Sequence, residues 1–114
     1  MSNKVDYFEI GTPHPDAARA FYGGLFGWQI GPPSAPAQYA PVQTDKGGLW
    51  DTSDMGAATW AIFYVRVDDV AQAVADAESL GGTVAIPLVD NGTIKFAHLI
   101  DPDDNRFGIW KPKQ

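Results

Sequence analysis

The two halves of this 114-residue chain repeat one pattern at an offset of 55 residues. Phe8 in the first half matches Phe63 in the second, and Gly27 matches Gly82. Both halves have the same order of strand, helix cap, helix, glycine stop and strand. A chance match of one strand and one helix is common, but a match that also aligns both helix ends is less so. The repeat therefore predicts a structural duplication within one domain.

The first half is expected to begin with a strand at residues 5–11 and to continue with a helix. His14 takes the N-cap position, Pro15 suits the first helical turn, and glycines at 23, 24 and 27 weaken and then end the helix. Its expected apolar face consists of Ala17, Ala18, Ala20, Phe21 and Leu25. Further strands are predicted at 28–30, 38–44 and 49–52, with a Pro-rich loop at 31–36 and a turn at 45–48.

The second half contains the clearest strand of the chain, at residues 60–67. Asp69 is expected to cap the helix that follows, and Gln72 completes a capping box. The apolar face of this helix is predicted to be Val70, Ala73, Val74, Ala77 and Leu80, before Gly81 and Gly82 end it. Strands are predicted at 83–87, 94–100 and 106–110, with a hairpin turn at Asn91-Gly92 and another turn at 101–105.

Alternation along the strands separates a face that packs beneath a helix from an opposite face. The helix-facing residues are expected to be Phe8, Ile10, Ala61, Phe63, Val65, Val67, Phe107 and Ile109. The opposite face is mixed aromatic, apolar and charged, with Tyr7, Glu9, Trp60, Ile62, Tyr64, Arg66, Arg106, Gly108 and Trp110. Aromatic groups mixed with charge are typical of a ligand cleft.

Composition narrows the possible functions. The chain has no cysteine, which excludes disulfides and thiolate metal sites. Its net charge of −6 disfavours nucleic acid as a partner and is compatible with a cationic ligand, although acidity also serves solubility alone. The sequence offers no apolar run of about 20 residues for a membrane span and no signal peptide, so a cytoplasmic location is expected.

Three runs of sequence resemble one known superfamily. They are VDYFEIGTPHPDAARAFYGGLFGW, FYVRVDDVAQAVADAESLGG and FAHLIDPDDNRFGIW, and they follow one another in family order. They resemble the glyoxalase/bleomycin resistance/dioxygenase superfamily, also called vicinal oxygen chelate proteins, as found in single-domain bacterial members. The resemblance implies an α+β fold in a single domain at 1–114. It further implies two tandem βαβββ modules, about 4–54 and 59–112, in a curved sheet around a shared cleft, often in a homodimer.

The family's metal enzymes hold a divalent ion with histidine and carboxylate ligands. By the family motif, three of the ligand positions fall on Tyr7, Ile62 and Gly108, and isoleucine and glycine have no ligating side chain. Near the fourth position only Asp51 could ligate. The expectation is therefore a family member without the usual metal site, and no other cofactor is predicted.

Glu9 is the main catalytic candidate, as a general base, and it could also bind a ligand cation. The alternatives are that it pairs with Arg66 or Arg106, or is solvated. His98 could act in proton transfer, but a structural histidine is the more frequent case. Tryptophans could stack on a planar ligand or lie in a core or dimer interface. The residues expected to line the ligand site are Tyr7, Glu9, Trp50, Trp60, Ile62, Tyr64, His98, Gly108 and Trp110.

Two functional classes follow, with a third as a variant. The favoured hypothesis is a metal-free protein that binds a small aromatic or cationic molecule in the cleft between the modules, as the family's antibiotic-sequestering members do. The alternative is a metal-independent isomerase or lyase that uses Glu9, Tyr7 or His98 for proton transfer. The variant is a metal-dependent lyase or dioxygenase with relocated ligands, for instance Glu9 with His98. The sequence identifies neither the ligand nor any reaction.

Overall fold

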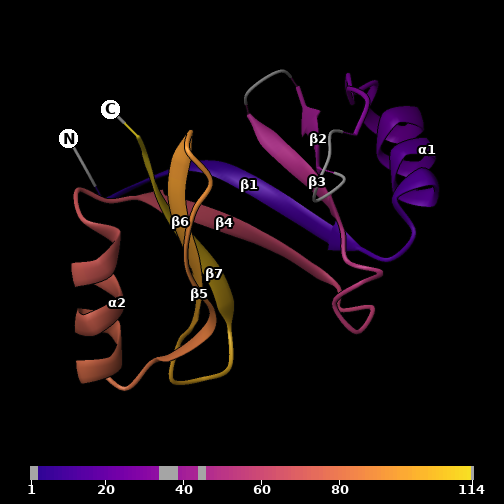
Figure 1. Cartoon of the computed structure of the whole chain (residues 1–114). Helices are drawn as coiled ribbons and strands as arrows, with labels where there is room; N and C mark the ends of the chain where they lie inside the picture. The colour runs from indigo at the N-terminus through magenta and orange to yellow at the C-terminus, as the bar shows by residue number, and fades with distance from the viewer. Residues whose placement is uncertain (1–2, 34–38, 44–45, 114) are drawn as a thin grey trace. The chain divides into compact units, whose positions relative to one another are not determined.

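The computed structural model describes residues 3–33, 39–43 and 46–113. It has the α+β class that was predicted, with two helices and a mixed β-structure (Figure 1). Its elements are β1 (Lys4–Thr12), α1 (Pro15–Phe26), β2 (Tyr39–Val42), β3 (Gly47–Asp51), β4 (Trp60–Arg66), α2 (Val70–Ser79), β5 (Thr83–Asp90), β6 (Ile94–Ile100) and β7 (Arg106–Pro112). They group into two compact units, one of Tyr7–Ala61 and one of Met1–Asp6 with Ile62–Gln114.

In the first of these units the strands follow the order β2-β3-β1. β3 runs parallel to β1 and antiparallel to β2, so Leu49 is paired with Ile10 on one side and with Ala40 on the other. Ala40, Val42 and Leu49 form a buried cluster, against which Phe8 and Ile10 pack. The predicted inward face of the first strand is therefore confirmed.

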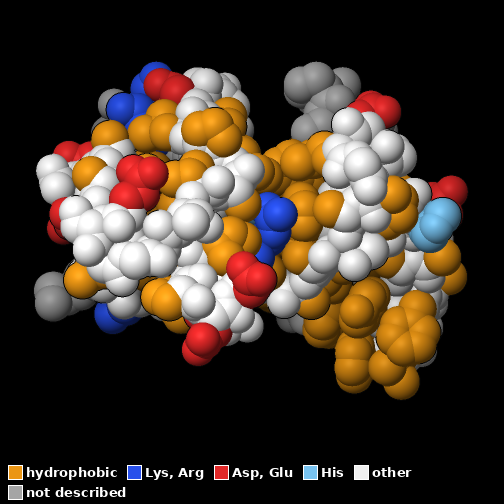
Figure 2. Space-filling view, turned by 90° about the horizontal axis from the view of Figure 1, so that it is seen from below, with side chains coloured by type: hydrophobic (Ala, Val, Ile, Leu, Met, Phe, Trp, Pro, Cys, Tyr) orange, Lys and Arg blue, Asp and Glu red, His pale blue; other side chains and the backbone are white. Residues whose placement is uncertain are grey.

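Helix α1 begins and ends as expected, but its predicted apolar face is wrong. Phe21 and Leu25 are 61% and 60% exposed, and of the expected face only Ala18 packs against the core cluster. Tyr22 lies on the covered side of the helix instead, where its ring stacks on Trp28 with ring centroids 5.8 Å apart. Figure 2 shows hydrophobic side chains gathered at the molecular surface. His14 occupies the cap position without a side-chain capping bond, and Gly27 ends the helix with a φ of 68°.

Two strand predictions in this unit need correction. Residues 28–30 do not form a strand, because only Ile30 makes an isolated bridge, to Val42. The turn predicted at 45–48 is wrong at Gly47 and Gly48, which belong to β3. The ring of Phe8 covers Gly47 and the ring of Tyr39 covers Gly48, so these glycines serve close packing of aromatic rings.

In the second unit the strands follow the order β4-β7-β6-β5. β4 is parallel to β7, and the other neighbours are antiparallel. One face of this sheet packs against α2, where Val67, Val70, Ala97, Leu99 and Ile109 form the buried core and Ala73, Val74 and Ala77 join it. Figure 1 shows α2 beside these strands.

The predicted faces of β4 and β7 are correct where α2 covers them. Val65, Val67, Phe107 and Ile109 all belong to or pack on the core, as expected. Phe63 is 47% exposed and stacks on Phe107, and Ala61 is also exposed. The expectation that Ala61 and Phe63 lie beneath a helix is therefore wrong.

Helix α2 is capped as the sequence indicates, because the Asp69 Oδ1 accepts a hydrogen bond from the Gln72 N–H at 3.0 Å. The side chain of Gln72 donates to Asp76 instead of completing the capping box. Leu80 is 81% exposed, so its predicted place on the apolar face is wrong. The helix ends at Ser79, which places Leu80 beyond the covered face.

Two turns connect the strands that follow. β5 is longer than predicted and reaches Asp90, and the expected turn at Asn91-Gly92 is present with a φ of 89° at Gly92. In the turn before β7, the Asp101 Oδ1 accepts hydrogen bonds from the N–H groups of Asp103 and Asn105. These bonds hold the pKa of Asp101 below its usual range, with the Asn105 N–H as the main cause. In the described part of the chain, neither helix is long and apolar enough to cross a membrane.

Candidate functional site

A buried carboxylate organises the unit Tyr7–Ala61. Glu9 is 1% exposed, on the face of β1 opposite Phe8 and Ile10. The Tyr39 hydroxyl donates to its Oε1 at 2.8 Å, and the Trp60 indole N–H donates to its Oε2 at 2.8 Å. Both oxygens therefore accept a hydrogen bond from a neutral donor. Glu9 is not solvated, contrary to one of the readings left open above.

Aromatic rings surround this carboxylate, and we call Tyr7, Glu9, Tyr39, Trp50 and Trp60 the Glu9 cluster. The Trp50 ring packs edge-to-face with Tyr39 at 5.9 Å between centroids and with Trp60 at 5.7 Å. The hydroxyls of Tyr7 and Tyr39 lie 3.0 Å apart. Because Tyr39 donates its proton to Glu9, Tyr7 is the donor in this bond. Tyr7, Tyr39 and Trp50 are half-buried, so part of the cluster reaches the surface.

Glycines allow these rings to lie close to the strands. A Cβ on Gly11 would lie 2.6 Å from the Trp60 Nε1, and a Cβ on Gly48 would overlap the Tyr39 ring. Real Cβ atoms do not approach other heavy atoms so closely, so any larger residue would displace the ring. The orientation of the Glu9 hydrogen-bond donors thus depends on two glycines in neighbouring strands.

A second polar group lies in the other unit, and we call Tyr64, His98 and Arg106 the His98 cluster. His98 is fully buried on β6 and Tyr64 is 4% exposed on β4. The Tyr64 hydroxyl lies 2.5 Å from His98 Nε2, and Arg106 Nη1 lies 3.0 Å from His98 Nδ1. The ring of Phe96 packs against His98 with centroids 6.2 Å apart. His98 is thus hydrogen-bonded at both ring nitrogens.

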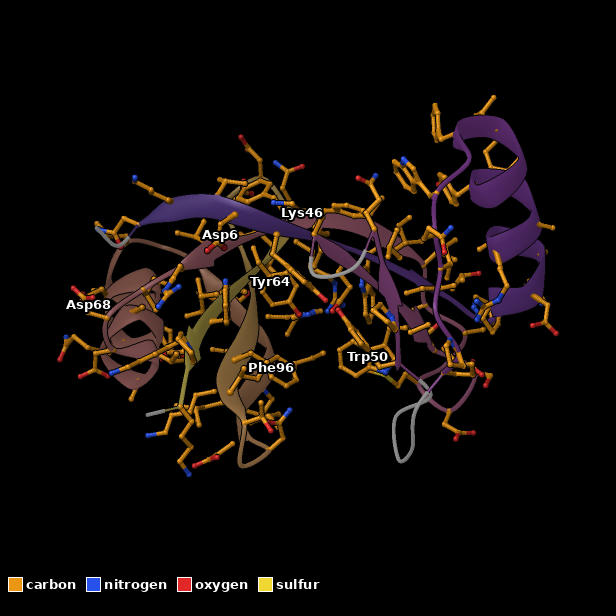
Figure 3. The ribbon with its side chains drawn as sticks, turned by 90° about the horizontal axis from the view of Figure 1, so that it is seen from above. Asp6, Lys46, Trp50, Tyr64, Asp68 and Phe96 are labelled. Atoms are coloured by element: carbon orange, nitrogen blue, oxygen red, sulfur yellow. The ribbon has the colours of Figure 1, made fainter. Side chains whose placement is uncertain are left out.

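Gly108 lies on β7 directly opposite Tyr64 in the parallel ladder. A Cβ at Gly108 would lie 2.6 Å from the Tyr64 Cδ2, so the tyrosine ring occupies the space over this residue. Figure 3 shows the side chain of Tyr64. The space for a longer side chain is filled by the ring of the neighbouring strand.

The remaining predicted residues lie outside the two clusters. Ile62 is buried at 8% exposure and offers only a hydrocarbon surface. The Trp110 indole N–H donates to Asp6 Oδ1 at 2.9 Å, and the Arg66 guanidinium lies over its ring, 5.4 Å from the centroid. Arg66 therefore makes a cation–π contact. The membership of Ile62 and Trp110 in a ligand site stays a prediction.

The metal that the superfamily implies does not fit the donor set of this chain. Tyr7 is hydrogen-bonded to Tyr39, Ile62 has no donor atom, and the space at Gly108 holds the Tyr64 ring. Asp51 accepts a bond from the Ser53 N–H, and bonds to Ser53 lower the pKa of its carboxyl. Among residues 3–33, 39–43 and 46–113, no three histidine or acidic side chains gather as a metal site would require.

Two functional candidates were missed by the sequence analysis. Tyr39, in the range predicted as strand 38–44, joins Tyr7 to Glu9. Arg106, predicted on the face opposite the helices and as an alternative partner of Glu9, contacts His98. The pairing of Tyr39 with Trp50 across the ladder could have indicated the first. No sequence signal indicated the second, because Arg106 and His98 are neighbours only through the β6–β7 register.

The chain resembles known proteins in both sequence family and fold. The chain belongs to the family of glyoxalase-like domains, because the model of that family matches residues 7–110. No curated protein matches the sequence.

Solved structures share the fold at low sequence identity. Methylmalonyl-CoA epimerase of Streptomyces coelicolor in complex with 2-nitronate-propionyl-CoA aligns with a TM-score of 0.66 at 15% identity, over 100% of both chains. A glyoxalase/bleomycin resistance protein/dioxygenase superfamily member of Vibrio splendidus aligns with a TM-score of 0.64 at 15% identity, over 96% of this chain and 99% of that one. A hypothetical protein of Bacillus halodurans aligns with a TM-score of 0.65 at 15% identity, over 100% and 97%.

Proposed function

We propose that this glyoxalase-like protein binds a small, planar, cationic aromatic molecule without a metal ion, and that the Glu9 cluster recognises it. The observation that carries the proposal is the buried Glu9 carboxylate, which is held by Tyr39 and Trp60 and adjoined by the half-buried ring of Trp50. A carboxylate among aromatic rings attracts a cation in two ways, by its charge and by the ring faces.

The hydrogen bonds of Glu9 favour binding over proton transfer. A general base needs an oxygen within reach of the proton that it abstracts. Each Glu9 oxygen already accepts a bond at 2.8 Å, from Tyr39 or from Trp60. In this arrangement the carboxylate orients two rings and supplies negative charge. A metal-independent isomerase or lyase with Glu9 as base would have to use the second lone pair of an oxygen that already accepts from Tyr39 or Trp60.

The net negative charge of the chain also supports a cationic ligand. A net charge of −6 raises the local concentration of cations and increases their association rate. The same charge repels anionic ligands unless a basic group meets them. A homodimer, expected from the superfamily resemblance, stays a prediction that sedimentation would test.

The test compares two probes of nearly the same shape, benzamidine as a planar cation and benzamide as its neutral counterpart. Isothermal titration should show that benzamidine binds the wild-type chain more tightly. The Glu9→Gln variant should bind benzamidine at least about tenfold more weakly, since a unit charge about 4 Å from a cation near a protein surface contributes about 4 kcal/mol and tenfold corresponds to about 1.4 kcal/mol.

Glu78→Gln is the matched control, because it removes the same charge from an exposed position of α2. It should leave the affinity for benzamidine unchanged, while thermal unfolding of Glu9→Gln shows that the fold is retained. Equal weakening by both variants would mean that only the net charge matters. Equal affinity of both probes for the wild type would overturn the cationic preference.

A further inference from the structure

Helix α1 turns its apolar face away from its own unit. All residues of Pro15–Phe26 are described, and none of them is buried. Figure 1 shows one side of α1 next to β2 and β3 and the other side turned away from them. The exposed side has the spacing of a helical stripe, and we call it the α1 face: Ala17, Ala20, Phe21, Gly24 and Leu25. A stripe that would ordinarily fill a core therefore lies on the surface of this unit.

Contacts on the opposite side of the helix fix this orientation. The Arg19 side chain donates to the carbonyl oxygens of Ile30 and Gly31, at 2.8 and 2.7 Å. Tyr22, three positions later, stacks on Trp28. Rotating α1 to bury the α1 face would break these two hydrogen bonds and separate the two rings. The exposure of the α1 face is thus a property of the folded unit, and its burial needs a surface from outside that unit.

The α1 face is large and uncharged. Phe21 and Leu25 are 61% and 60% exposed, and Phe26, which flanks them at the end of the helix, is 56% exposed. Aromatic side chains bury about 150–250 Å² each, so these three residues together expose about 300 Å². The charged residues of the helix lie elsewhere, because Asp16 precedes the α1 face and Arg19 is on the opposite side. Contiguous apolar surface of this size is often a site of interaction.

We infer that the α1 face is the interface of a homodimer, in which α1 of one copy packs on α1 of a second copy across a twofold axis. A twofold interface joins the same surface of both copies, so that surface must be complementary to itself. The large side chains of Phe21 and Leu25 alternate along the helix with three small residues, which leave room for the large side chains of a second copy. The inference does not rest on the proposed function, because the α1 face contains no member of the Glu9 cluster.

Area and charge support a second copy as the occupant. Two copies would bury about 600 Å² from Phe21, Leu25 and Phe26, and the small residues and helix backbone between them bring the total toward about 1,000 Å². This is the lower end for a specific interface, so the dimer is expected to be weak and to depend on concentration. Two copies that each carry a net charge of −6 repel each other. An uncharged contact surface allows them to associate despite this repulsion.

Sedimentation equilibrium of the full chain tests the dimer over concentrations from about 1 μM to about 1 mM. The wild type should pass from monomer to dimer within this range. Leu25→Glu should weaken the dimer at least about tenfold, because the twofold axis introduces the carboxylate twice into one apolar interface. Leu80→Glu is the matched control, since Leu80 is an 81% exposed leucine just after α2, and it should dimerise like the wild type. Circular dichroism checks that both variants keep their fold.

Cross-linking locates the interface. The chain has no cysteine, so Ala20→Cys carries a single thiol, near the middle of the α1 face. A short bismaleimide should convert this variant into a covalent dimer. Ala75→Cys is the control, because it places a thiol at an exposed alanine of α2, and it should remain a monomer under the same conditions.

Each of these measurements has a result that overturns the inference. One is a wild type that stays monomeric up to about 1 mM. Others are a dimer that Leu25→Glu leaves unchanged, or one that Leu80→Glu weakens as strongly, since the dimer would then use another surface or respond only to net charge. A dimer that salt weakens would be held by ionic contacts, contrary to an uncharged interface. Equal cross-linking of Ala20→Cys and Ala75→Cys would indicate random collisions. Binding of benzamidine is measured separately and concerns the proposed function alone.

Discussion

Replacing Gly108 by alanine tests the close packing on which the His98 cluster depends. The added Cβ would overlap the Tyr64 ring, with the Cδ2 at 2.6 Å, and the three nearest atoms all belong to that ring. The ring has little freedom to move, because Tyr64 is 4% exposed and its hydroxyl is bonded to His98. We therefore expect a marked loss of stability from the addition of one methyl group.

The magnitude follows from the cost of overpacking. Extra methyl groups in a well-packed core cost about 1–3 kcal/mol. For a domain of this size, each kcal/mol lowers the unfolding midpoint by about 3–6 °C. The midpoint of Gly108→Ala should therefore fall by about 5–15 °C in thermal unfolding followed by circular dichroism.

Two controls make this result specific. Gly24→Ala introduces the same methyl group in α1, where the added Cβ would meet no atom within 4 Å beyond its chain neighbours and the helix's own backbone. It should raise stability by about 0.5–1 kcal/mol through helix propensity. In a Tyr64→Ala background the ring is gone, so Gly108→Ala should cost almost nothing more. The reasoning would be refuted if Gly108→Ala lowered the unfolding free energy equally with and without the Tyr64 ring. It would also be refuted if Gly108→Ala lowered the unfolding free energy of the otherwise wild-type chain by less than about 0.5 kcal/mol.

Further predictions concern the core, a turn and metal ions. Leu99→Ala should lose about 2–5 kcal/mol in urea unfolding, because Leu99 is 2% exposed, whereas Leu80→Ala should change stability by less than about 0.5 kcal/mol, because Leu80 is 81% exposed. The pKa of Asp101 is lower in the folded chain than in the unfolded one, so its contribution to stability is present above the unfolded pKa and is lost as pH falls through the folded value. Asp101→Asn should remove that acid dependence from midpoints measured between about pH 5 and pH 2. Zinc or nickel ions added to chelator-treated protein should move the midpoint by less than about 1 °C, and a large increase would show that the donor set was misjudged.

The features that the sequence predicts well are set by neighbouring residues. Asp69 and Gln72 lie three positions apart, and their contact caps α2. Gly92 adopts the positive φ that glycine allows, and the Asn91 Oδ1 accepts hydrogen bonds from the N–H groups of Thr93 and Ile94. The clearest strand, predicted at 60–67, is present as β4 because its bulky and β-branched residues suit a sheet.

The wrong predictions concern features that are determined by contacts between residues far apart in the sequence. The spacing of Phe21 and Leu25 shows that they share a side of α1, but it cannot show which side is covered. Tyr22 is covered because it stacks on Trp28, and the side chain of Arg19 donates to the carbonyls of Ile30 and Gly31. These contacts turn the helix away from the orientation that its apolar residues alone would favour.

In the candidate site, too, some features were predictable from the sequence and others were not. Strand alternation placed Glu9 and Phe8 on opposite faces, and the fold confirms this because Phe8 packs on the core cluster while Glu9 contacts Trp60. The position of Tyr39, one of the two partners of Glu9, depends on Gly48, which was predicted to lie in a turn. A glycine in a strand beside an aromatic residue indicates a ring lying flat on the sheet, and Gly48 with Tyr39 is such a pair.

The internal repeat predicted from the sequence relates one residue of each cluster. At the offset of 55 residues, Glu9 in β1 matches Tyr64 in β4, so one strand position holds a buried hydrogen-bonding group in both units. The chemistry of the two groups differs, because a carboxylate can accept two bonds at once while a phenol accepts one and donates one. Glu9 accepts from Tyr39 and Trp60, whereas Tyr64 takes its place in a chain that begins at Arg106. The same strand position therefore holds an acceptor-only group in one unit and a group that can both accept and donate in the other.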